Sequence, residues 1–178
     1  MRHRLGAMDD EVETDAQSDA PRSLALVLSP TRLSIGPTRA LLNWRLDLTN
    51  GGDAHLVALR IWSDMDTAHA SVPDARQLGG PDMDRARLLT LAMLAPGESA
   101  SVIGEWQLDR TAMKPVGTPA KPMIVPLARF RILGAGLAPQ KRIFVIGSPP
   151  ANDSERVGAL GLEANLQIHS RLAAREIS

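Results

Sequence analysis

Residues 94–106, with the sequence LAPGESASVIGEW, come closest to a catalytic motif in this chain. Within them, residues 97–101 match the G-x-S-x-G nucleophile elbow of serine hydrolases except at the final position. An elbow places its serine between a strand and a helix, whereas the alternating residues after Ser99 predict a strand. Pro96 and Gly97 also suit the two central positions of a type II turn. We therefore predict that Ser99 belongs to a hairpin turn and is not a nucleophile.

Asp64, Asp66 and His69 place two carboxylates and an imidazole within one short stretch. Oxygen ligands two residues apart resemble the start of a calcium-binding loop, but the glycine and the final glutamate of such a loop are missing. We interpret this stretch as a solvated acidic loop and predict no metal site. His55, which we expect to face solvent, and His169 have no carboxylate or serine partner at a meaningful spacing.

No catalytic residue, cofactor or metal ligand is predicted elsewhere. The sequence has no Cys, which excludes disulfides and thiol nucleophiles, and it has no phosphate-binding glycine loop. Trp44, Trp62 and Trp106 lie in segments that alternate like strands. We expect Trp44 and Trp62 in the core, with an exposed binding anchor as the alternative for one of the three.

Charge and hydropathy exclude several classes of partner. The 178 residues include 20 basic and 20 acidic side chains, so the balance of charge indicates neither nucleic acid nor an anionic membrane. No apolar run approaches the roughly 20 residues that span a bilayer. Residues 1–22 are acidic and polar, which predicts a disordered tail. We expect the chain as given to be cytoplasmic, or inner-membrane-anchored or periplasmic if a segment upstream is missing.

Seven segments have the period-two alternation of strands and are bounded by turn residues. They are residues 24–29, 42–49, 55–62, 88–93, 100–108, 123–133 and 141–146. Pro30 ends the first, and residues 63–86 and 109–122 are expected to be long loops. Residues 157–177 are compatible with either a helix or a strand.

No helical segment separates these strands, so the pattern predicts an all-β, immunoglobulin-like antiparallel β-sandwich of about seven strands at residues 23–147. Residues 148–178 would form a C-terminal extension packing on the sandwich or trailing from it. We assign the first, second, fourth and fifth strands to one sheet and the third, sixth and seventh to the other. A barrel is the alternative.

The order of several segments resembles an uncharacterised group of proteins from sphingomonad-type alphaproteobacteria. These segments are SLAL (23–26), RLDLTNGGDA (45–54), LAPGES (94–99), PMIVPL (122–127), FVIG (144–147) and RLAAR (171–175). In those proteins a single N-terminal membrane helix and a proline-rich linker precede one immunoglobulin-like β domain. The resemblance covers residues 23–178 and implies the fold but no activity or catalytic residue. The present sequence differs in lacking the membrane helix.

These observations predict a non-enzymatic interaction or structural module with an unknown protein partner. The alternatives are an envelope module that binds carbohydrate or lipid, and a hydrolase built on the loops. Short connections at 50–53, 94–99 and 134–140 should share one end of the sandwich, and those at 30–39, 63–86 and 109–122 the other. Loops as long as the last two are often functional, although they can also be idle. We therefore expect a partner to bind at this second end, which would gather Asp64, Asp66, His69, Arg110 and Lys114.

Overall fold

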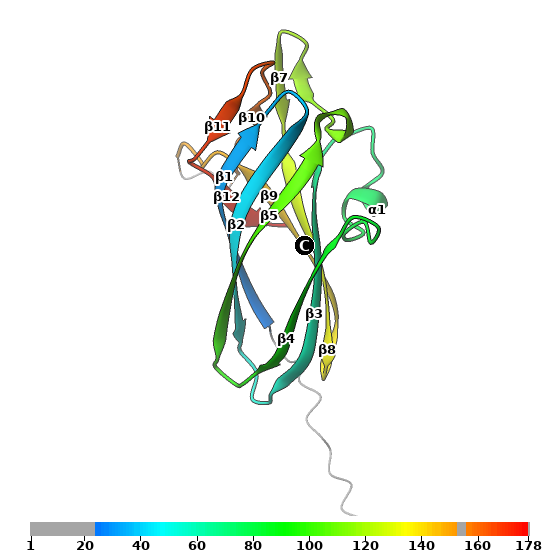
Figure 1. Ribbon diagram of the computed structural model, residues 1–178, viewed down its shortest axis with the longest axis vertical. Coiled ribbons are helices and arrows are strands. Elements are labelled where there is room, and N and C mark those ends of the chain that lie inside the picture. Colours follow the sequence, from blue (N-terminus) through cyan, green and yellow to red (C-terminus); the bar gives the residue numbers. More distant parts are fainter. Residues whose placement is uncertain (1–23, 153–155, 178) are drawn as a thin grey trace, which may run out of the picture.

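The computed structural model describes residues 24–152 and 156–177, which form two antiparallel sheets packed face to face with a smaller sheet at one end (Figure 1). The predicted tail at residues 1–22 lies outside the described residues. The longer strands are β1 (Leu24–Ile35), β2 (Arg39–Asn50), β3 (Leu56–Thr67), β4 (Arg87–Leu94), β5 (Ser99–Asp109), β8 (Pro126–Ala135) and β9 (Leu137–Gly147). The shorter elements are α1 (Asp74–Gln77), the 3-10 turn η1 (Arg110–Ala112), β6 (Val116–Thr118), β7 (Lys121–Ile124), β10 (Leu160–Gly161), β11 (Gln167–His169) and β12 (Ala173–Glu176).

The strand order is β11-β1-β2-β5 in one large sheet and β12-β9-β8-β3-β4 in the other, with β10-β7-β6 as the small sheet. Every strand pair is antiparallel. The prediction of an all-β antiparallel sandwich is confirmed. The short connections β2–β3, β4–β5 and β8–β9 lie together at one end, as expected (Figure 1).

The fourth strand belongs to a different sheet from the one predicted. β4 pairs with β3, from Leu56 opposite Leu94 to Ser63 opposite Arg87, and forms the edge of the five-stranded sheet. The long connection after β3 turns the chain back beside the strand that it has just left. Alternation alone cannot reveal this, because a half-buried strand has the same pattern in either sheet.

Several predicted boundaries were wrong. β1 continues through Pro30 to Ile35, and the register with β2 shifts between Pro30 and Arg32. A bulge tolerates a residue that has no N–H to donate. Residues 63–67, expected in a loop, complete β3, and the expected loop at 109–122 contains η1, β6 and the start of β7.

The C-terminal segment is built of strands, so the helical alternative for residues 157–177 was wrong. β10 pairs with β7, β11 with β1 and β12 with β9, which extends all three sheets. In the described part of the chain no helix has the length and apolar character to cross a membrane.

The core joins the two large sheets through stacked aromatic rings. Trp44 on β2 stacks on Trp106 on β5 at 4.5 Å, and Trp106 meets Phe130 of the opposite sheet edge-on at 5.6 Å. Trp106 Nε1 also donates a hydrogen bond to Ser63 Oγ at 3.1 Å. A bulky ring fits over β5 because Gly104 faces Trp44, and a Cβ there would lie 2.4 Å from the ring. The prediction of a core position is confirmed for Trp44.

For Trp62 the core prediction was wrong. Ile61 and Ser63 on either side are fully buried, so Trp62 points to the outer face of the sheet, where it is half-buried. The Arg60 guanidinium lies 5.5 Å from the centre of its ring, a cation–π contact.

Candidate functional site

The serine motif forms a turn, but the prediction of a hairpin was wrong, because the turn joins β4 of one large sheet to β5 of the other. Gly97 has φ +72°, and the Glu98 N–H donates to the Ala95 carbonyl at 3.0 Å, which closes the turn. Ser99 then begins β5, and its hydroxyl lies 2.7 Å from Thr49 Oγ1 on β2. A strand therefore follows the serine where an elbow requires a helix.

The outer face of the five-stranded sheet is covered at one place. Residues 63–65 of β3 and 126–130 of β8 are buried without interruption, so both faces of the sheet are shielded there. The four-stranded sheet covers the inner face, and the segment 68–86 with α1 lies over the outer face beside β3 (Figure 1). Asp64 and Asp66 are consequently strand residues beneath a cover, and the prediction that they form a solvated loop was wrong.

Beneath this cover lies an ion pair between Asp64 and Arg129, which face each other across β3 and β8. Arg129 Nε donates to Asp64 Oδ1 at 2.8 Å and Nη2 donates to Oδ2 at 2.5 Å. Both side chains are about 95% buried. Burial by itself would lower the pKa of Arg129, but the hydrogen bonds and charge of Asp64, with the charges of Asp66 and Asp82, raise it above its ordinary value. The guanidinium therefore remains charged, as a buried charge with a bidentate partner should.

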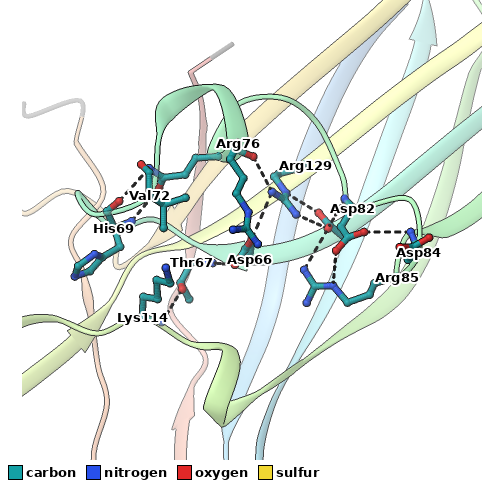
Figure 2. A network of polar contacts seen from close by, with 12 residues as sticks. Asp66, Thr67, His69, Val72, Arg76, Asp82, Asp84, Arg85, Lys114 and Arg129 are labelled. Atoms are coloured by element: carbon teal, nitrogen blue, oxygen red, sulfur yellow. Dashed lines mark hydrogen bonds and ion pairs between the residues drawn. The ribbon is translucent and has the colours of Figure 1, made fainter.

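The same pair holds the covering segment in place, and we call Asp64 and Arg129 the clamp. Arg129 Nη1 donates to the Arg76 carbonyl at 3.3 Å, and Asp64 Oδ2 accepts from the Asp82 N–H at 2.9 Å (Figure 2). Arg129 thus contacts α1, and Asp64 contacts the turn at residues 79–86. Arg85 adds an ion pair to Asp82 at 3.1 Å.

Beside the clamp is a polar hollow of about 290 Å³. It is lined by Asp66, Thr67, Val72, Arg76, Asp82, Arg85, Thr111, Ala112 and Lys114. Its two carboxylates already have cationic partners, since Asp66 lies 3.4 Å from Arg129 and Asp82 pairs with Arg85. The pKa of Asp82 is lowered, first by the hydrogen bond from the Asp84 N–H and then by Arg85, so this carboxylate is firmly ionised.

Next to the hollow, and also beside α1, lies an apolar groove of about 400 Å³. It is lined by Ala68, His69, Ala70, Asp74, Gln77, Leu78, Val116, Val125, Leu127, Val145 and Ile177. Leu127 and Val145 are cross-strand neighbours on β8 and β9 and form its floor. Gln77 supports its rim, because its side chain accepts from the His69 N–H at 2.9 Å and donates to the Val72 carbonyl at 2.7 Å.

One contact made by His69, at the groove, has the composition of a catalytic dyad. His69 Nδ1 lies 2.7 Å from Ser71 Oγ. The same nitrogen accepts the Ser71 N–H at 3.1 Å, so the contact belongs to a local turn. A catalytic histidine is also oriented by a third group, usually a carboxylate. In the structure as described, no carboxylate is hydrogen-bonded to this ring.

The structure brings together four of the five residues expected at the second end. Asp64, Asp66, His69 and Lys114 surround α1. Arg110 lies apart from them, because its guanidinium donates to the carbonyls of Gly36 and Glu163 and ties the β1–β2 connection to the C-terminal segment.

Sequence reasoning missed Arg129, Arg76 and Leu78. Arg129 lies in the predicted strand at residues 123–133, and only the register opposite Asp64 indicates its role. Leu78 lies in the segment 63–86, which was expected to be a long loop, and the sequence does not show that it borders a groove.

Within residues 24–152 and 156–177, no group of three or more His, Asp or Glu side chains could hold a metal ion. No protein-family model matches the sequence, and no curated protein matches it. Among solved structures, a crystal structure from Bordetella pertussis assigned to ApaA is similar over 68% of this chain and 87% of that chain, with 13% identity and a TM-score of 0.32. A TM-score this low supports no inference about function.

Proposed function

We propose that this chain is a non-enzymatic interaction module that binds an extended segment of a protein partner in the apolar groove beside α1. The observation that carries the proposal is the groove itself, an apolar surface that the clamp and Gln77 hold in one shape. Its volume of about 400 Å³ is in the range of sites that take a small ligand or a few aliphatic side chains. A preorganised groove loses little conformational entropy when a partner binds.

Peptide display on the immobilised protein tests the proposal, because the selection itself finds the sequences that bind. Selected peptides are then measured against the wild type and Leu78→Asp. Leu78 is 36% exposed at the rim of the groove. A carboxylate there should weaken binding at least about tenfold, since it loses an apolar contact and would have to be desolvated.

Ile103→Asp is the matched control. Ile103 is 80% exposed on the outer face of the other large sheet, so the same change of chemistry is made away from the groove. Peptides that lose affinity for Ile103→Asp but not for Leu78→Asp would place the binding surface elsewhere. A failure to select any peptide above background would count against an interaction function.

A hydrolase is the second candidate, because His69, which lines the same groove, has its Nδ1 2.7 Å from Ser71 Oγ. It predicts hydrolysis of apolar acyl esters by the purified protein, abolished in Ser71→Ala. We expect no such activity, because no carboxylate among the described residues orients the imidazole and Nδ1 already accepts the Ser71 N–H.

A further inference from the structure

The polar hollow next to the groove contains two cationic side chains, Arg76 and Lys114, whose charged groups are not engaged by other described residues. Arg76 uses only its carbonyl in the clamp, and Lys114 uses only its N–H, which donates to Thr67 Oγ1 at 2.9 Å. Over the described residues, neither the Arg76 guanidinium nor the Lys114 ammonium group has a hydrogen-bond or ion-pair partner. Figure 2 shows both side chains extending toward the region of Asp66 and Thr67.

The charge of the hollow suits an anion with a single charge. Three cations line it, Arg76, Arg85 and Lys114, against two carboxylates, Asp66 and Asp82. The charge of Arg129, which lies near Asp66, is already balanced by Asp64, so the lining keeps one positive charge in excess. Arg85 is paired with Asp82, which leaves Arg76 and Lys114 as the cations placed to bind an anion. A carboxylate would balance that excess, whereas the second charge of a phosphate monoester would be repelled by Asp66 and Asp82.

The hollow and the groove adjoin. Residues adjacent in sequence line one and then the other in two places, Thr67 and Ala68, and Arg76 and Gln77. Lys114 of the hollow and Val116 of the groove are separated by one residue. Residues adjacent in sequence have Cα atoms about 3.8 Å apart. In an extended peptide, side chains two residues apart project from the same face at a spacing of roughly 7 Å. One peptide can therefore place an aliphatic side chain in the groove and an acidic side chain in the hollow.

We propose that the partner segment carries an Asp or Glu two residues from an aliphatic residue, and that Arg76 and Lys114 bind its carboxylate. This inference rests on the proposed function, because it names the chemistry of the segment that the groove receives. The groove provides the apolar contact, and Arg76 and Lys114 favour those apolar segments that also carry a carboxylate.

Two matched peptides test the inference by NMR titration of the whole chain at low salt. The first has leucine at its second and sixth positions, glutamate at its fourth and serine elsewhere, with both ends blocked, and the second has glutamine in place of glutamate. We expect the wild type to prefer the glutamate peptide about five- to tenfold, the scale of two exposed ion pairs. The preference should decline as salt screens the charges.

The variant Arg76→Gln/Lys114→Gln should bind both peptides equally, with the affinity of the wild type for the glutamine peptide. Lys121→Gln, which removes one exposed cation on β7, should keep the preference. The inference is overturned if the wild type shows no preference, or if the double variant retains it.

Further measurements separate this inference from the proposed function. If both peptides bind equally and Leu78→Asp weakens both, the groove stands and the carboxylate site is wrong. If neither peptide binds, titration with sodium acetate tests the carboxylate site alone. Chemical-shift changes of the backbone amides at positions 76 and 114 in the wild type, absent in the double variant, would support a carboxylate site although the peptide groove fails. If acetate causes no such changes, the carboxylate site is overturned. Tighter binding of decanoate than of either peptide, dependent on Leu78, Arg76 and Lys114, would identify an acyl ligand and overturn the peptide assignment.

Discussion

Replacing Arg129 by Met tests whether the clamp holds the covering segment on the sheet. The change removes two hydrogen bonds to Asp64, at 2.8 and 2.5 Å, one to the Arg76 carbonyl at 3.3 Å, and the contact with Asp66 at 3.4 Å. It leaves the Asp64 carboxylate about 95% buried, with Arg85 at 3.9 Å as its remaining cationic neighbour among the described residues. Breaking a buried pair in this way costs about 3–5 kcal/mol. At 2–4 °C per kcal/mol for a chain of this size, the thermal midpoint should fall by roughly 6–20 °C.

Urea unfolding followed by tryptophan fluorescence measures this loss, and trypsin cleavage after Arg76 and Arg85 reports whether the cover has loosened. Asp64→Leu combined with Arg129→Met should cost less than the sum of the single changes by at least about 2 kcal/mol, because no unpaired charge remains. The exposed pair Arg45–Asp47 provides the control, and Arg45→Met should cost less than about 1 kcal/mol. Equal costs for Arg129→Met and Arg45→Met, or additive costs within the clamp, would refute the reasoning.

Two further outcomes follow from the core. Gly104→Ala should destabilise the protein by about 1–3 kcal/mol in urea unfolding, because the new Cβ would lie 2.4 Å from the Trp44 ring; an unchanged midpoint would contradict this packing. Trp106→Ala should cost about 3–5 kcal/mol, whereas Trp62→Ala, on the outer face, should cost less than half as much. Equal losses for the two tryptophans would show that Trp62 belongs to the core after all.

Local patterns in the sequence were sufficient to predict the class of fold. In β2, buried Leu42, Trp44, Leu46 and Leu48 alternate with less buried residues, because successive side chains of a strand point to opposite faces. Gly97 was recognisable as a turn residue because its neighbour Pro96 presets one half of a type II turn. Such features depend on residues close together in the chain, so the sequence displays them directly.

The candidate site, in contrast, depends on how β3 and β8 are aligned and on the segment 68–86 that covers them. His69 and Lys114 could be assigned to one end of the sandwich from the succession of strands. That Arg129 lies opposite Asp64 depends on which residues of two distant strands are aligned, and a shift by one residue would turn one of them to the other face.

The sequence by itself therefore determined an antiparallel β-sandwich and the end at which its long connections meet. Only the tertiary structure decided that β4 pairs with β3, that Trp62 faces outward, and that the 68–86 segment lies over one sheet. The physical reason is that alternation shows that one face of a strand is buried but not what buries it. The clamp, the groove and the hollow exist because a covering segment buries the outer face as well, and that cover is a long-range contact.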